Sequence, residues 1–157
     1  MNRKELPQRQ QNRLTALNYS ETGAYFITIC TQGRKKLFWD DVGAATGRPW
    51  EERLSSCGRV VLQAVQQIPL RYPAISVDQA VVMPDHVHLL LQIHAEESGR
   101  AMPAPTVSTV VQQMKGAVSK QVGFPVWQKG FYDHVVRGEQ DYREIWTYIE
   151  GNPLKLD

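Results

Sequence analysis

Residues 86–94, with the sequence HVHLLLQIH, constrain the fold more than any other segment of the chain. A run this apolar is typical of a strand that is buried in the middle of a sheet. A Pro-Asp turn precedes it, and a loop with Gly99, Pro103 and Pro105 follows it over residues 95–105. We therefore expect a central strand with neighbouring strands on both sides.

The remaining segments alternate between strand-like and helix-like patterns. Segments rich in aromatic and β-branched residues predict three more strands, over residues 24–31, 75–83 and 131–137. Apolar residues at helical spacing predict three helices, over 54–70, from Thr106 or Ser108 to about 122, and over 139–151. Residues 40–53 contain two glycines and a proline, and they predict a loop, with a short hairpin as one option.

The order of these elements indicates an α+β fold. Strand, helix, strand, strand, helix and strand in succession form the split βαβ, or ferredoxin-like, arrangement, which is an antiparallel sheet with two helices on one face. The final helix is an addition to that pattern. We expect residues 1–20 to form an N-terminal arm and residues 21–157 to form a single domain.

Composition excludes some classes of protein and leaves nucleic-acid binding open. No apolar run approaches the roughly 20 residues needed to cross a bilayer, and the polar start does not resemble a signal peptide, so we expect no membrane contact. Cys30 and Cys57 form no CxxC pattern, which indicates reduced thiols in a cytoplasmic protein. The net charge of +2 is too small to indicate DNA binding, although Arg34, Lys35 and Lys36 form a basic run that can meet phosphates.

His86 and His88 are separated by one residue in the expected central strand. Side chains alternate between the two faces of a strand, so both imidazoles point the same way, with Cα atoms roughly 7 Å apart. Such a pair is able to share one divalent ion. Two polar residues at the end of a strand are the more common explanation of a bare pair. His94 shares the face but lies about 20 Å farther along the strand, too far for a third ligand.

Tyr148 and Asn152 lie four residues apart at the end of the last expected helix, so they share one helical face. The Asn152 amide oxygen suits Mg²⁺ or Mn²⁺, and a cation held at the negative end of the helix dipole would lie beside the Tyr148 hydroxyl. The alternative is structural, because Gly-Asn-Pro is a good helix stop and Tyr148 borders a buried stripe. Taken alone, these residues favour the structural explanation.

Four segments combine into a more specific pattern: GAYFITICTQGRKKLF (23–38), VVMPDHVHLLL (81–91), VWQKGFYDHVV (126–136) and DYREIWTYIEGNPLK (141–155). Together, in this order, they resemble the HUH single-tyrosine transposases, in particular the branch called REP-associated tyrosine transposases. By that resemblance, His86 and His88 match the motif histidines. Asn152 matches the third metal ligand, and Tyr148 matches the tyrosine nucleophile.

The resemblance implies that the single domain is a metal-dependent enzyme with Mg²⁺ or Mn²⁺ as its cofactor. Such an enzyme cleaves single-stranded DNA and transfers the strand through a 5′-phosphotyrosine intermediate. The expected partner is single-stranded DNA with hairpins or repetitive extragenic palindromes, bound by a monomer or homodimer in the cytoplasm, at the nucleoid. The expected DNA contacts are Arg34, Lys35, Lys36, Trp127 and Tyr132.

Two other functions stay open at this point. A domesticated hairpin-binding protein with the same fold would not cleave DNA, and it would have no need of a tyrosine nucleophile. A metal-dependent hydrolase unrelated to DNA would use water instead of Tyr148 as its nucleophile. Covalent trapping of DNA on the protein distinguishes all three functions.

Overall fold

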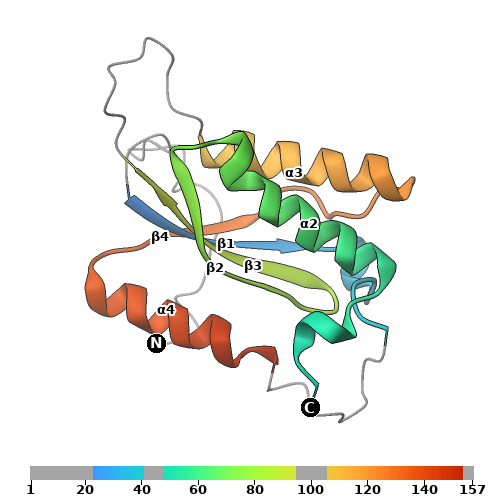
Figure 1. Ribbon diagram of the computed structural model, residues 1–157, viewed down its shortest axis with the longest axis horizontal. Coiled ribbons are helices and arrows are strands. Elements are labelled where there is room, and N and C mark those ends of the chain that lie inside the picture. Colours follow the sequence, from blue (N-terminus) through green and yellow to red (C-terminus); the bar gives the residue numbers. More distant parts are fainter. Residues whose placement is uncertain (1–22, 41–47, 95–105, 154–157) are drawn as a thin grey trace.

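Helices cover both faces of a central sheet: α2 and α3 lie on one face and α4 lies on the other (Figure 1). The computed structural model describes residues 23–40, 48–94 and 106–153. The expected arm over residues 1–20 and the expected loop over residues 95–105 fall outside these described residues.

The described residues form one four-stranded antiparallel sheet in the order β2-β3-β1-β4. The strands are β1 (Gly23–Cys30), β2 (Ile75–Val82), β3 (His86–Ile93) and β4 (Tyr132–Val135). β3 lies between β1 and β2, so the prediction of a central strand is confirmed. The α+β class, with an antiparallel sheet and an added last helix, is confirmed as well.

The helices are α2 (Ser56–Arg71), α3 (Val107–Val122) and α4 (Glu139–Gly151), and two short 3-10 helices are η2 (Gln32–Arg34) and η3 (Trp50–Arg53). Both α2 and α3 bury an apolar stripe, made of Val61, Val65 and Ile68 in α2 and of Val107, Val110, Val111, Met114 and Val118 in α3. α4 buries Ile145 and Ile149 in the same way. None of the described helices is both long enough and apolar enough to span a bilayer.

Local sequence signals explain where α2 and α3 begin. The Ser55 side chain accepts a hydrogen bond from the Gly58 N–H at 3.0 Å and so caps α2. Gly58 must be glycine, because a Cβ there would collide with the Phe38 carbonyl oxygen. The Thr106 side chain accepts from the Thr109 N–H at 3.1 Å, so Thr106 is the cap of α3 and Ser108 is not.

Most expected bounds differ from the observed ones by one or two residues, for example Ser56–Arg71 for the helix expected over 54–70, and two segments differ more. The fourth strand spans only Tyr132–Val135, because β1 pairs with these four residues and the chain then turns through Gly138, at φ 100°, into α4. Residues 50–53, expected to be loop, form η3, while Trp39 and Leu54 make an antiparallel bridge that is in keeping with a short hairpin. Residues 41–47 of that expected loop lie outside the described part of the chain.

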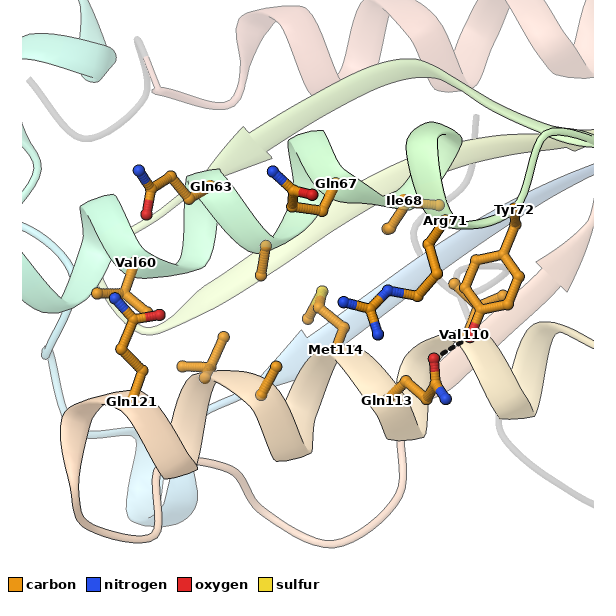
Figure 2. Close-up of a pocket in the computed structure, with 13 residues that line it drawn as sticks. Val60, Gln63, Gln67, Ile68, Arg71, Tyr72, Val110, Gln113, Met114 and Gln121 are labelled. Carbon is orange, nitrogen blue, oxygen red and sulfur yellow. Dashed lines mark hydrogen bonds between the residues drawn. The ribbon is translucent and has the colours of Figure 1, made fainter.

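A cavity of about 320 Å³ lies between α2 and α3 (Figure 2). Its polar lining includes Gln63, Gln67, Arg71 and Gln121, and the Tyr72 hydroxyl donates a hydrogen bond to the Gln113 side chain across it. None of the expected site residues lines this cavity. The cavity is therefore separate from the residues expected to form the site.

Candidate active site

The first residues of β3 bring two imidazoles together. The ring centroids of His86 and His88 lie 4.6 Å apart, with 71° between the ring planes. His88 pairs in register with Thr28 of β1, and Thr28 also pairs with Tyr132 of β4. Residues that face each other in register lie on the same face of a sheet, so Thr28, His88 and Tyr132 share one face.

α4 places Tyr148 on that same face. The Tyr148 ring centroid lies 5.5 Å from that of His88 and 6.0 Å from that of Phe26, whose ring it meets edge-on at 86°. Tyr148 also borders a shallow surface hollow that Arg143 and Thr147 line. The tyrosine therefore stands between a buried histidine and the protein surface, within a single chain.

His88 is the more deeply buried of the two histidines, with 4% of its surface exposed. Burial lowers the pKa of His88 well below its usual 6.5, and the nearby positive charge of Arg34 lowers it further, so the ring is neutral. Its Nδ1 lies 2.9 Å from the Thr28 hydroxyl, whereas its Nε2 is buried and has no hydrogen-bond partner among the described residues. With the proton on Nδ1, the Nε2 atom presents a lone pair.

His86 has a carboxylate as its partner. Its Nδ1 donates to Asp85 Oδ1 at 2.7 Å, and Asp85 Oδ2 accepts from Arg34 Nε at 3.2 Å. Burial alone would raise the pKa of the Asp85 carboxyl, but the hydrogen bonds from His86 and Arg34 lower it to about 2. Asp85 is therefore an anion at neutral pH that holds the Nδ1–H of His86.

Asn152 lies one turn after Tyr148 and ends α4. Its backbone N–H donates to the Ile149 carbonyl at 3.2 Å, and its side chain is half-buried. Among the described contacts none joins the Asn152 amide to either imidazole. The assignment of Asn152 as a metal ligand therefore stays a prediction.

Similar sequences extend over most of the chain. No model of a known protein family matches it. An uncharacterized protein of Haemophilus influenzae is 30% identical over 165 residues, which cover 93% of this chain and 88% of that protein. A second protein of that organism, provisionally named REP-associated tyrosine transposase, is 23% identical over 146 residues, which cover 88% of this chain and 74% of that protein.

Two solved structures have a similar fold. One is a REP-associated tyrosine transposase bound to a REP hairpin, with a TM-score of 0.61 and 20% identity, covering 89% of this chain and 72% of that chain. In sequence and in fold, the chain therefore resembles the REP-associated tyrosine transposases. The other structure, a provisionally assigned transposase of Deinococcus radiodurans, has a TM-score of 0.50 and 20% identity, covering 87% of this chain and 95% of that chain.

The divalent ion that the family resemblance implies fits the donors present. His88 Nε2 is a buried nitrogen that needs a partner, and His86 keeps its Nε2 for a ligand because Asp85 holds its Nδ1. Neutral imidazole nitrogen and amide oxygen together suit Mn²⁺ or Mg²⁺. The described residues contain no cluster of three or more His, Cys, Asp or Glu, so an ion here needs a ligand of another kind, such as the Asn152 amide.

The residues expected to contact DNA have different surroundings. Arg34, Lys35 and Lys36 are all exposed, and Tyr132 is 37% exposed on the histidine face. Trp127 instead packs with Phe38, at 5.5 Å between ring centroids, and its Nε1 is buried without a partner among the described residues. Tyr132 is thus better placed than Trp127 to stack on a base, although both contacts stay predictions.

Two side chains beside the histidines were missed in the sequence. Thr28 is the one polar residue among apolar neighbours in FITIC, and that break in the pattern was a usable signal. The Pro-Asp pattern predicts only a turn at Asp85, although this residue directly precedes His86. Each of them contacts an imidazole Nδ1 and so bears on which nitrogen stays available.

Proposed function

We propose that this protein cleaves single-stranded DNA beside a hairpin and transfers the strand through a 5′-phosphotyrosine intermediate on Tyr148. The observation that supports this most is the Tyr148 ring 5.5 Å from His88, whose buried Nε2 has no described partner. A tyrosine transposase needs a tyrosine nucleophile beside a metal-binding histidine, and Tyr148 and His88 would supply this pair.

The cleavage step is a displacement at phosphorus. The Tyr148 hydroxyl oxygen attacks the phosphate and forms a new P–O bond, while the bond from phosphorus to the 3′-oxygen of the preceding nucleotide breaks. The phenol loses its proton, and the departing 3′-oxygen gains one. Products are a 5′-phosphotyrosine on the protein and a DNA end with a free 3′-hydroxyl.

A divalent ion, when bound, withdraws charge from the phosphate oxygens and favours the phenolate over the phenol. His86 and His88 would hold it through Nε2, with Asn152 as a third ligand. Thr28 and Asp85 engage the two Nδ1 atoms and so keep the Nε2 atoms for that task.

The second step reverses the first with a different strand. A 3′-hydroxyl from another DNA end attacks the phosphotyrosine, forms a phosphodiester and returns Tyr148 to its phenol form. The bond energy is kept in the intermediate, so no nucleotide cofactor is required. Transfer between DNA strands, rather than hydrolysis, is the outcome that this chemistry favours.

A DNA hairpin is the substrate that we propose, because a family member is known in complex with a REP hairpin. Arg34, Lys35 and Lys36 present positive charge at the end of β1, close to the histidines, and would meet phosphates. Tyr132 offers an exposed ring on the same face for stacking. We propose the nucleoid as the place of action, since this substrate is chromosomal.

The test uses a pool of hairpin-bearing single strands labelled at their 3′ ends, incubated with the protein and Mn²⁺. A labelled band at the size of protein plus DNA on a denaturing gel supports the proposal, because the protein joins the 3′-labelled fragment. Cleaved DNA without this band would indicate attack by water. Hairpin binding without any cleavage would indicate the domesticated binding protein.

A further inference from the structure

The turn after β1 and the turn before β3 are tied together beside the histidines. The Thr31 N–H donates to the Asp85 carbonyl at 3.0 Å, and the Thr31 hydroxyl lies 3.2 Å from the same oxygen and 2.8 Å from the Lys35 carbonyl. Thr31 and Lys35 flank η2 at its two ends. The backbone of Asp85 therefore has a defined position relative to η2.

Arg34 has a backbone conformation that is rare for a residue with a side chain, with φ at 55°. Gly33 before it has φ at 67°, and the Arg34 N–H donates to the Thr31 carbonyl at 3.1 Å. From this turn the Arg34 side chain reaches Asp85, with Nε 3.2 Å from Oδ2. Strained backbone of this kind persists where the surrounding contacts hold it, and it is concentrated at functional sites.

Asp85 uses its two carboxylate oxygens for two different partners. Oδ1 accepts from His86 Nδ1 at 2.7 Å, and Oδ2 accepts from Arg34. A carboxylate on Nδ1 keeps the imidazole proton there and orients the ring, and it makes the opposite nitrogen a stronger metal ligand. The Arg34 bond in turn limits rotation of the carboxylate.

We propose that Asp85 and Arg34 are positioning residues for His86, which hold its ring in the Nδ1–H form and present Nε2 to the divalent ion. This inference rests on the metal site of the proposed function. It adds a chain of three side chains, Arg34 to Asp85 to His86, that begins on a surface expected to contact DNA. The Arg34 side chain is 56% exposed, so it stays available to a phosphate.

A simple surface ion pair is the alternative explanation for Arg34 and Asp85. Exposed pairs of that kind contribute little to stability and would not affect metal binding. The chain contains a matched control, because Asp141 accepts from His134 Nε2 at 2.8 Å and has no described contact with His86 or His88. Removing the two carboxylates in parallel separates the two explanations.

The first measurement is the affinity for Mn²⁺ alone, by titration calorimetry of the full chain. We expect Asp85→Ala to weaken binding about 10- to 100-fold, the usual loss for such a partner of a metal ligand. Asp85→Asn should lose less, since its amide oxygen still accepts from Nδ1, and Arg34→Ala should lose less than Asp85→Ala. Asp141→Ala should bind Mn²⁺ as the wild type does.

The second measurement is the protonation pattern of the His86 ring, by ¹⁵N NMR of the metal-free protein. Wild type and Asp85→Asn should show the proton on Nδ1, whereas Asp85→Ala should show a mixture of both forms. If Asp85→Ala does not fold, Asp85→Asn and Arg34→Ala still test the metal affinity.

The outcomes separate this inference from the proposed function. If Asp85→Ala or both milder variants bind Mn²⁺ as tightly as the wild type, the positioning role is overturned even where cleavage is confirmed. A wild type without Nδ1–H on His86 overturns it as well. If the wild type binds no Mn²⁺, the metal site of the proposed function fails, and the positioning role for a metal fails with it.

Discussion

Two clusters on the α4 face of the sheet use the same residue types in different ways. One, the anchor group, consists of Asp78, His134, Asp141 and Tyr142. The other, the site group, consists of Asp85, His86, His88 and Tyr148. Each contains a histidine bound to an aspartate and a tyrosine from α4, so the difference between them lies in what each leaves unpaired.

In the anchor group, the tyrosine and the histidine each have an aspartate partner within the group. The Tyr142 hydroxyl donates to Asp78 Oδ2 at 2.7 Å, and Asp141 Oδ2 accepts from both His134 Nε2 and the Arg137 N–H at 2.8 Å. Burial and the Asp78 carboxylate raise the pKa of Tyr142 to about 12. These bonds attach the N-terminal half of α4 to β2 and β4.

The site group leaves one buried histidine nitrogen without a described hydrogen-bond partner. Asp85 and Thr28 satisfy one nitrogen of each histidine, but His88 Nε2 stays buried without a described partner beside Tyr148. A buried polar atom without a partner costs about 1–3 kcal/mol of stability. We infer that the anchor group holds the helix in place, and we propose that the site group is available to a ligand.

The largest expected difference between the two groups is in the rate of DNA cleavage after substitution. His88→Ala removes a buried imidazole that we expect to hold the ion, so the cleavage rate with Mn²⁺ should fall by at least about a thousandfold. His134→Ala changes the anchor group only and should keep most of the activity per folded molecule.

EDTA should abolish wild-type cleavage. His86→Ala should also abolish cleavage, while hairpin binding, measured by fluorescence anisotropy, should stay largely intact. Full cleavage activity of the wild type in EDTA would contradict the proposal that the site group holds a divalent ion.

For the free energy of unfolding, substitution in the anchor group should cost more than substitution in the site group, and both losses should be small. Tyr142→Phe removes the donor to Asp78 and should lower the free energy of unfolding by about 1 kcal/mol, since both groups are partly exposed. That corresponds to a fall of about 2–4 °C in Tm for a chain of this size. Tyr148→Phe should cost less, because Tyr148 borders the surface at an open site. Thermal unfolding followed by circular dichroism measures both, and a larger loss for Tyr148→Phe would make it the structural tyrosine.

The smallest expected effect is a dependence on alkaline pH. The folded-state pKa of Tyr142, about 12, lies above the ordinary value of 10, so its contribution to stability is complete below pH 10 and is lost as the pH rises toward 12. Urea unfolding at pH 9 and pH 11 should show a larger loss for the wild type than for Tyr142→Phe. Equal losses would mean that Asp78 does not hold the Tyr142 proton.

Periodicity in the sequence accounts for much of the fold and part of the site. The order of strands and helices, the central position of β3 and the shared face of His86 and His88 all follow from local patterns. The spacing of Tyr148 and Asn152 follows from helix geometry, but the face of the sheet that α4 covers does not. That choice depends on packing between segments far apart in the chain.

The partners of the histidines could not be predicted in the same way. Thr28 meets His88 only because β1 and β3 pair in one particular register, 60 residues apart in sequence. Arg53, which is charged yet 2% exposed, lies 4.4 Å from the centre of the Trp39 ring, a contact that no local pattern indicates. Such contacts depend on tertiary packing, and local sequence carries little information about it.

Mapping the covalent adduct tests the central claim most directly. The protein is incubated with hairpin-bearing single strands and Mn²⁺, digested with protease and nuclease, and analysed by mass spectrometry for a nucleotide on tyrosine. We predict that the modified peptide contains Tyr148, that Tyr142→Phe gives the same peptide, and that Tyr148→Phe gives none. A modification on Tyr142 or Tyr132, or cleavage at the normal rate by Tyr148→Phe, would contradict the assignment of Tyr148 as nucleophile.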